Sequence, residues 1–355
     1  MFRTRYLTVL AAVMLVAVAF VTSGCKQAEV EATPEVTSSW PEATTEPVVA
    51  EPVVPPRWPL TGLDAPDEAS PQTRVVSVKV ENSPVARPQS GLQSADVVYE
   101  SVTEGGVTRF NLLFHSDLPE SVGPVRSARI SDTYIVPQYG AMFAFSGSSS
   151  FVKSALGRVE FDNLSQDSGW TAGYRRTSTR SAPHNLYLDV AKLRDAAIER
   201  DRSATQNIQS FQYDYAASAP ATITANSVNI RFSNANTVDW TYDSAKDAYM
   251  RVNGGKVHMD ANTGEQVSAT NVVVVWAQHS PTGARDVTGS MTYDIKLTGS
   301  GNCAVFHNGV RYDGTWEAGA TTPPSFKAAD GSPLKLAPGN TWFQVVSPDV
   351  NISVK

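Results

Sequence analysis

The sequence lacks the usual signatures of a catalytic or metal-binding protein. It contains no Gly-x-Ser-x-Gly motif, no zinc-binding His-Glu pair and no Cys-His arrangement of the kind used in nucleophilic catalysis. Only five histidines are present, and His258, His279 and His307 fall among expected strands without the spacing of metal ligands. We therefore predict no metal and no cofactor.

Positive charge is also scarce. With 29 Lys and Arg against 35 Asp and Glu, the formal net charge is −6, which argues against a nucleic-acid partner, because such partners are bound by strongly basic domains. The segment 126–180 differs from the rest, because its basic residues outnumber its acidic ones. A local positive excess in an acidic protein points to an anionic ligand.

No apolar run is long enough to cross a membrane comfortably. The run over 7–21 follows two arginines and is typical of a signal peptide that covers residues 1–24. The small residues before Cys25 resemble a bacterial lipobox, in which the cysteine is acylated and anchors the mature chain to the extracytoplasmic face of the cell membrane. Thr22 stands where an aliphatic residue is usual, so cleavage by the ordinary signal peptidase, followed by secretion, is the alternative.

Cysteine and proline usage characterise the chain after the signal peptide. Acylation of Cys25 leaves Cys303 without a disulfide partner, so Cys303 is expected to be a buried small side chain. Residues 25–58 combine the lipidated cysteine with many Pro, Glu and Thr, and they show no helical or strand period. This composition predicts a disordered acidic tether, after which the chain is long enough for two folded domains.

The first folded part, 59–215, shows mixed periodicity. Alternating apolar residues indicate half-buried strands, and helical spacing appears between them. Strands are expected at 76–80, 95–102, 107–116 and 141–145, and helices at 124–136, from residue 151 and at 189–202.

The second folded part, 222–355, consists of short apolar runs separated by turn signals. Asn-Gly and Asp-Gly pairs such as Asn308-Gly309 supply the positive φ angles of hairpin turns. The predicted fold class is therefore α+β, with a mixed α/β N-terminal domain followed by a mostly antiparallel β C-terminal domain. Strands are expected at 228–232, 272–276 and 343–346, and core tryptophans at 240, 276, 316 and 342.

The most informative motif is the stretch 122–129, Val-Gly-Pro-Val-Arg-Ser-Ala-Arg. Pro124 suits the first position of a helix. Arg126 and Arg129 would then share the first turn, beside free backbone N–H groups at the positive end of the helix dipole. This arrangement predicts an anion cradle. The alternative is that both arginines pair with nearby carboxylates and only stabilise the fold. The candidate partners are Glu100, Glu104 and Asp132.

Loops supply further candidates, since they carry many functional groups. The small-residue loop 146–150 follows an apolar strand and is a weak match to a phosphate-binding turn. His184 lies in irregular chain, where it is either functional or a structural imidazole bonded to a backbone carbonyl. The predicted ligand-binding residues are Arg87, Arg109, Arg126, Arg129, Ser148, His184 and Asn185, and the candidate catalytic residues are Glu104 and His184.

Several short blocks also occur in a fixed order. They read VEN at 80–82, ARPQSGL at 86–92, ADVVYE at 95–100, EGGVTRF at 104–110, GPVRSAR at 123–129 and APHNLY at 182–187, with later stretches at 271–276 and 339–342. These blocks resemble the YerB-like lipoproteins, a domain-of-unknown-function family with N- and C-terminal domains. The resemblance implies a membrane-anchored extracytoplasmic protein, and it carries over no activity and no catalytic residue.

Two functions are compatible with these residues. In the first, a cell-envelope lipoprotein binds an anionic ligand or a protein partner through its arginines. In the second, an envelope hydrolase or transferase uses Glu104 and His184 as acid and base. A groove lined by arginines and backbone N–H groups favours binding, whereas a pocket with two carboxylates near His184 favours an enzyme.

Overall fold

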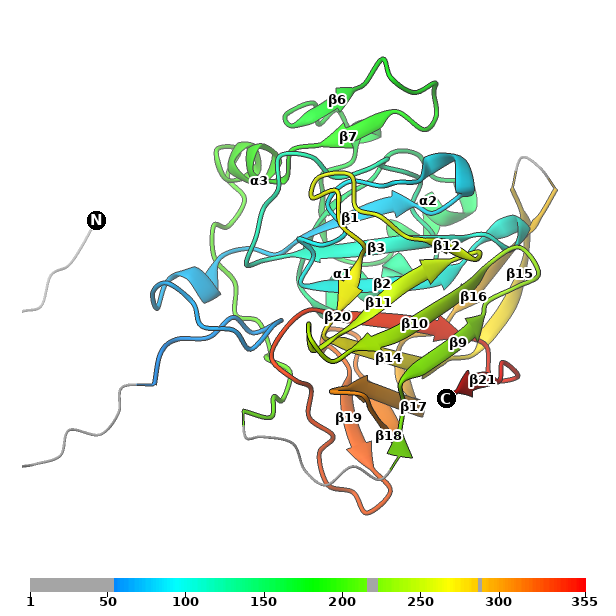
Figure 1. Ribbon diagram of the computed structural model, residues 1–355. Helices are drawn as coiled ribbons and strands as arrows, with labels where there is room; N and C mark the ends of the chain where they lie inside the picture. Colours follow the sequence, from blue (N-terminus) through cyan, green and yellow to red (C-terminus); the bar gives the residue numbers. More distant parts are fainter. Residues whose placement is uncertain (1–53, 216–222, 287–288) are drawn as a thin grey trace, which may run out of the picture. The chain divides into compact units, whose positions relative to one another are not determined.

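The computed structural model describes residues 54–215, 223–286 and 289–355 (Figure 1). The predicted signal peptide 1–24, Cys25 and most of the predicted tether 25–58 lie outside these ranges. Trp58, the last residue of that tether, packs edge-on against His115, with the ring centroids 4.7 Å apart.

One long sheet organises the described chain, and its strand order does not follow the sequence. From one edge to the other the strands are β19 (Ser325–Ala328), β18 (Val310–Ala318), β17 (Gly299–His307), β14 (Asn271–Trp276), β20 (Thr341–Val346), β2 (Val97–Val102), β3 (Thr108–Phe114), β1 (Val76–Glu81), β4 (Met142–Ala144) and β5 (Asp162–Asn163), with β8 (Ile223–Thr224) paired to β18.

Strand β20 joins the two halves of the sequence within this sheet. It runs parallel to β2 in a register from Val97↔Thr341 to Ser101↔Val345, and it runs parallel to β14 on its other side. The three strands are buried along nearly their whole length, as parallel strands covered on both faces are expected to be. N-terminal and C-terminal strands therefore share one hydrogen-bonded ladder.

A second sheet packs on one face of the first. Trp240 of the second sheet meets Trp342 of the first edge-on, with the ring centroids 5.2 Å apart. Both side chains are fully buried, as the sequence predicts. The strands of this sheet are β12 (Lys256–Val257), β11 (Ala248–Asn253), β10 (Thr237–Asp243), β9 (Ser227–Arg231) and β21 (Ile352–Val354), with β13 (Ser268–Ala269) paired to β11. Two further pairs of strands form separate two-stranded sheets: β15 (His279–Arg285) with β16 (Met291–Ile295), and β6 (Tyr174–Arg176) with β7 (Leu186–Leu188).

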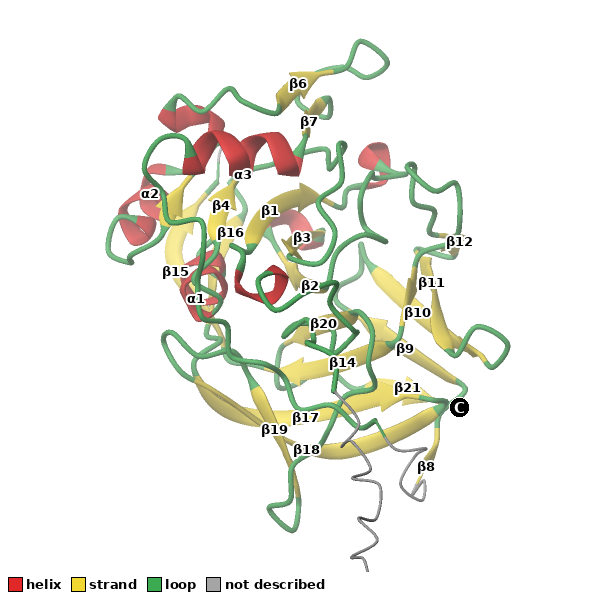
Figure 2. Ribbon diagram, turned by 90° about the vertical axis from the view of Figure 1, so that its left-hand side faces the viewer, coloured by secondary structure: helices red, strands yellow, loops and turns green. Residues whose placement is uncertain are grey.

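The helices gather around the part of the large sheet that contains β1 and β4 (Figure 2). In the described chain they are α1 (Asp132–Gln138), α2 (Ser150–Leu156) and α3 (Val190–Ile198), with 3-10 turns η1 (Ser70–Gln72), η2 (Pro84–Ala86), η3 (Glu104–Gly106) and η4 (Gln166–Ser168). Ile135 and Val152 pack in the core on one face of the sheet, whereas Leu193 packs in the core on the other. Side chains of Ser149 and Asp189 cap α2 and α3 by accepting backbone N–H bonds.

The predicted α+β class is confirmed. The N-terminal half mixes strands and helices, and the C-terminal half is built mostly of antiparallel strands. The turn between β17 and β18 contains Asn308 and Gly309 with φ angles of 52° and 70°, which are the angles that the Asn-Gly pair predicts.

The helix predicted over 124–136 is wrong in its first half. Residues 122–128 are extended, because neighbouring strands use their backbone groups; the N–H of Arg126, for example, donates to the carbonyl of Lys79 at 2.9 Å. Helix α1 begins only at Asp132. Pro124 suits the first position of a helix, but hydrogen bonds to the neighbouring strands hold this segment extended and override that local preference.

Candidate functional site

The arginine-bearing segment 122–128 is held between β1 and β7. The N–H of Val125 donates to the carbonyl of Leu186 at 2.7 Å. Gly123 has a φ of 155°, and a side chain there would place its Cβ only 2.8 Å from that same carbonyl oxygen, so the close approach requires glycine. The helix terminus predicted beneath Arg126 is therefore absent, and any anion site must be built from side chains.

Arg126 and His184 converge on the carboxylate of Glu81, at the end of β1. Glu81 Oε2 lies 3.3 Å from Arg126 Nε and 2.7 Å from His184 Nδ1. The other oxygen, Oε1, accepts a hydrogen bond from Ser83 Oγ at 2.7 Å. The Glu81 side chain is 6% exposed, whereas those of Arg126 and His184 are 21% and 28% exposed. The enclosed carboxylate thus holds two groups that reach solvent.

A second carboxylate, that of Glu104, holds Arg129. Arg129 Nε donates to Glu104 Oε2 at 2.6 Å, and Nη1 donates to the carbonyl oxygens of Ser127 and Ala128. Thr292 on β16 donates to Glu104 Oε1 at 3.1 Å. A hairpin of the C-terminal half therefore helps to build a site that the N-terminal half dominates.

Arg109, on β3, is the most buried of the three arginines. Its Nη1 donates at 3.0 Å to a carbonyl oxygen that Arg129 also uses. Burial, with smaller contributions from the positive charges of Arg129 and Arg126, lowers the pKa of Arg109 to about 9, while Glu104 and Glu81 act in the opposite direction. The guanidinium groups are thus near enough to repel one another, and Arg109 still carries its charge at neutral pH.

We call this cluster the arginine site; its members are Arg109, Arg126, Arg129, Glu81, Glu104 and His184. Three guanidinium groups face two carboxylates, which leaves one positive charge in excess when the histidine is neutral. Among the described residues, nothing accepts a hydrogen bond from either Nη atom of Arg126 or from Nη2 of Arg109 and Arg129. These N–H groups are suited to bind an oxyanion.

Asp132 supports the site from beneath and is itself fully buried. Its Oδ1 accepts from Lys79 Nζ at 2.7 Å and from Asn111 Nδ2 at 3.0 Å, and its Oδ2 accepts from the N–H of Arg129 at 2.7 Å. Burial lowers the pKa of Lys79, and the charge of Asp132 opposes that shift. Asp132 therefore fixes the backbone of Arg129, although it is not a partner of either guanidinium group.

Two predicted members lie on the opposite face of the sheet. Arg87 donates from Nε and Nη2 to the side chain and the carbonyl of Asn82, at 3.0 and 2.8 Å. Glu100, a candidate partner for the arginines of segment 122–129, is fully buried and instead accepts a hydrogen bond from Arg251 at 2.7 Å. The structure thus groups Arg109, Arg126 and Arg129 with His184 and leaves Arg87 out.

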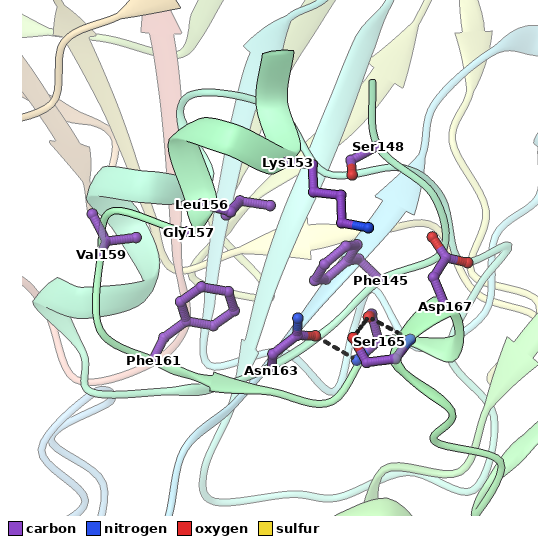
Figure 3. Close-up of a pocket in the computed structure, with 11 residues that line it drawn as sticks. Phe145, Ser148, Lys153, Leu156, Gly157, Val159, Phe161, Asn163, Ser165 and Asp167 are labelled. Carbon is purple, nitrogen blue, oxygen red and sulfur yellow. Dashed lines mark hydrogen bonds between the residues drawn. The ribbon is translucent and has the colours of Figure 1, made fainter. Parts of the chain in front are cut away.

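The remaining predicted residues lie around the site. Asn185 braces the β6–β7 hairpin, because its Nδ2 donates to the carbonyl of Thr177 at 3.2 Å and its Oδ1 accepts from Arg176 at 2.8 Å. Ser148 lines a pocket of about 390 Å³ between α2 and the loop after β5. In Figure 3, Leu156 and Phe161 lie on one side of this pocket and Lys153 and Asp167 on the other.

Glu81 is the site residue that the sequence analysis missed. The alternation of β1 carried the signal, because Lys79 and Glu81 must share the face opposite the valines, and Glu81 stands across from Arg109 in the register of β1 and β3. His184 pairs with this carboxylate and not with Glu104, its predicted catalytic companion.

Three properties of the described ranges bear on function. No group of three or more His, Cys, Asp and Glu side chains in them is arranged to hold a metal ion. No helix in them is long and apolar enough to cross a membrane. Cys303 is buried as expected, and burial raises the pKa of its thiol to about 12, so it is not a reactive nucleophile at neutral pH.

Comparison with known proteins gives concordant results over most of the chain. Residues 60–204 match the family described as "Protein of unknown function (DUF3048) N-terminal domain", and residues 228–343 match the corresponding C-terminal domain. The chain is 32% identical over 305 residues to the Bacillus subtilis (strain 168) protein named "Putative lipoprotein YerB", covering 82% of this chain and 86% of that protein.

A solved structure shares the fold as well. The crystal structure of the YerB protein from Bacillus subtilis superposes with a TM-score of 0.74 at 30% sequence identity, and the match covers 84% of this chain and 99% of that one. The order of sequence blocks, the paired family models and the shared fold lead to one conclusion. The chain belongs to the DUF3048 family, the YerB-like proteins that its sequence resembles.

Proposed function

We propose that this chain is an extracytoplasmic, lipid-anchored protein of the cell envelope that binds an anionic ligand at the arginine site. One observation carries the proposal: three guanidinium groups lie together with only two carboxylates to balance them. An anion would supply acceptors for the free N–H groups. It would also relieve the repulsion that contributes to the low pKa of Arg109.

The two carboxylates support binding by fixing the arginines. Glu81 and Glu104 each engage the Nε side of one guanidinium group, that of Arg126 and of Arg129 respectively. Arg129 is held by a hydrogen bond, whereas Arg126 is held by an ion pair alone, because its Nε has no hydrogen-bond partner among the described residues; both keep terminal N–H donors, so less side-chain freedom is lost when a ligand arrives. Surface arginines on flexible side chains would not offer this advantage.

The binding proposal is tested by replacing one guanidinium group with an ammonium group. Arg126→Lys keeps the charge and loses the planar fork, so we expect a cost of about 1.5 to 3 kcal/mol in binding, or roughly a 10- to 150-fold weaker Kd. The probe is an oligomer of glycerol phosphate, and titration calorimetry at low salt gives Kd. Arg311→Lys on β18 is the matched control, because Arg311 pairs with Asp313 away from the site. Equal Kd values for wild type and Arg126→Lys would contradict the proposal.

The anchoring half of the proposal concerns Cys25. The relative's printed name supports a lipoprotein, and Cys25 with its small preceding residues is the position that could carry the lipid. Cys25→Ser is expected to move the protein from the membrane fraction to the medium, or to leave an unprocessed precursor. Immunoblotting of cell fractions measures this. Unchanged partition and processing would show that Cys25 does not anchor the chain.

A further inference from the structure

Glu81 pairs with His184 as well as with Arg126, and anion binding alone does not explain the contact with the histidine. A carboxylate that only balanced Arg126 would not require an imidazole on the same oxygen, yet His184 Nδ1 lies 2.7 Å from Glu81 Oε2. A carboxylate is an acceptor, so Nδ1 carries a proton, and in its neutral form the ring presents the lone pair of Nε2. Nε2 forms no hydrogen bond with the described residues, and the side chain is 28% exposed.

The imidazole is also held beside the anion-binding groups. Glu81 Oε2 is 2.7 Å from His184 Nδ1 and 3.3 Å from Arg126 Nε, so the imidazole ring and the guanidinium group share one enclosed oxygen atom. Ser83 occupies the other carboxylate oxygen and fixes its orientation. A carboxylate that orients an imidazole next to an oxyanion-binding cluster has the arrangement of a general base with its positioning residue.

We propose that this site hydrolyses a phosphodiester, with His184 as the general base, Glu81 as its positioning residue and the arginines holding the phosphate; the proposal rests on anion binding at the arginine site. The net charge of the arginine site favours a phosphodiester over a phosphomonoester. One positive charge in excess matches the single negative charge of a phosphodiester better than the two charges of a phosphomonoester. Three guanidinium groups suit the oxygens of a tetrahedral phosphate, whereas a carboxylate is satisfied by one planar fork.

The step balances without a cofactor or an oxidant. Nε2 of His184 takes a proton from water as the water oxygen bonds to phosphorus. The bond from phosphorus to the leaving oxygen breaks, and the electron pair goes to that oxygen. The proton held by the imidazolium passes through solvent to the leaving alkoxide, which becomes an alcohol. A phosphomonoester and a neutral His184 result, while the arginines stabilise the charge that gathers on the phosphate oxygens.

The test uses the mature chain and bis(4-nitrophenyl) phosphate, whose hydrolysis releases a coloured phenolate. We expect turnover above buffer, a fall of about a hundredfold or more in kcat for His184→Gln, and an unchanged thermal midpoint. His279→Gln is the matched control, because the imidazole of His279 bonds to the carbonyl of Ala277 and not to a member of the arginine site. Glu81→Gln is expected to lower kcat about as much as His184→Gln does and, because Glu81 also pairs with Arg126, to raise KM as well, with an unchanged thermal midpoint; a fold defect would instead lower the midpoint.

Binding of glycerol phosphate oligomers, measured in parallel, separates the two proposals. If the wild type binds the oligomer but does not cleave the diester, or if His184→Gln cleaves it as fast as the wild type, the hydrolytic proposal is overturned and the binding proposal stands. If the wild type does not bind the oligomer, the proposed function fails first. Faster cleavage of 4-nitrophenyl phosphate than of the diester would overturn the assignment of the substrate class.

Discussion

Two arginine–glutamate pairs on opposite faces of the same sheet use identical chemistry in different settings. Arg251 and Glu100 lie 2.7 Å apart, and both side chains are fully buried. Arg129 and Glu104 lie 2.6 Å apart, with exposures of 16% and 6%. The first pair belongs to a closed network and the second to a site with spare donors. The residue types therefore do not identify a functional arginine; the number of unmatched donors and their access to solvent do.

The closed network is the group Arg251, Glu100, His258 and Gln89, and it uses nearly every polar atom. Arg251 Nε donates to His258 Nδ1 at 2.9 Å, and His258 Nε2, which must carry the proton, donates to Gln89 Oε1 at 2.7 Å. The rings of two core tryptophans lie 5.0 and 4.7 Å from the guanidinium carbon. Each nitrogen of Arg251 donates a hydrogen bond and its side chain has no exposed surface, so this network presents no solvent-facing donor to a ligand, although the charge of Arg87 lies nearby.

The largest effect is expected from breaking the closed network. Arg251→Ala strands the Glu100 carboxylate in the core, and we expect a loss of about 3 to 5 kcal/mol in the free energy of unfolding. Arg126→Ala removes a partly exposed arginine and is expected to cost about 1 kcal/mol or less. Urea denaturation of both variants measures the difference. Similar losses for the two would mean that the arginine site is a fold determinant, and the contrast between the faces would disappear.

A smaller effect is expected from acid. Burial, with the nearby charges of Arg251 and Arg87, holds the pKa of His258 well below its ordinary 6.5. The unfolded chain therefore binds a proton that the native chain does not, so the free energy of unfolding falls as the pH drops below about 6.5. Urea titrations at several pH values measure this slope. His258→Gln should lower stability at pH 7 and make the slope below pH 6.5 shallower, while His115, His279 and His307, whose pKa values burial also lowers, keep the remaining slope; an unchanged slope would place the acid sensitivity elsewhere.

Local sequence signals predicted many elements well. The strand at β1, the Asn-Gly turn before β18 and the helix predicted at 189–202 each depend on neighbours within a few residues, so their structures follow from the sequence nearby, although β1 is buried on both faces and not on one as its alternation predicts. The helix over 124–136 failed for the opposite reason. The groups that hold Arg126 extended come from Lys79 and from Leu186 in β7, which are distant in sequence and close only after folding.

The candidate site shows the same division. The sequence predicted Arg126 and Arg129 from a helix start that the structure does not contain and His184 from its place in a loop, yet the structure brings both arginines and His184 together with Arg109. The sequence also predicted Arg87 as a site residue, but Arg87 lies on the other face of the sheet. This error arose because no local pattern shows which face of the sheet a loop residue will occupy. Glu81 was missed because its role depends on a histidine more than a hundred positions away, and only the fold shows that pairing.

The position of β20 also affects the order in which the protein can be completed. The edge of β2 that faces β20 has its ladder filled only by residues 341–346, near the end of the chain. While the chain is being synthesised, that apolar edge stays open until residues 341–346 are available, and open apolar edges promote association between chains. A fragment ending before residue 341 would expose this edge permanently. The two segments that the family models match are thus separate in sequence but a single unit in assembly, because the sheet of the N-terminal half is complete only after residues 341–346 have been made.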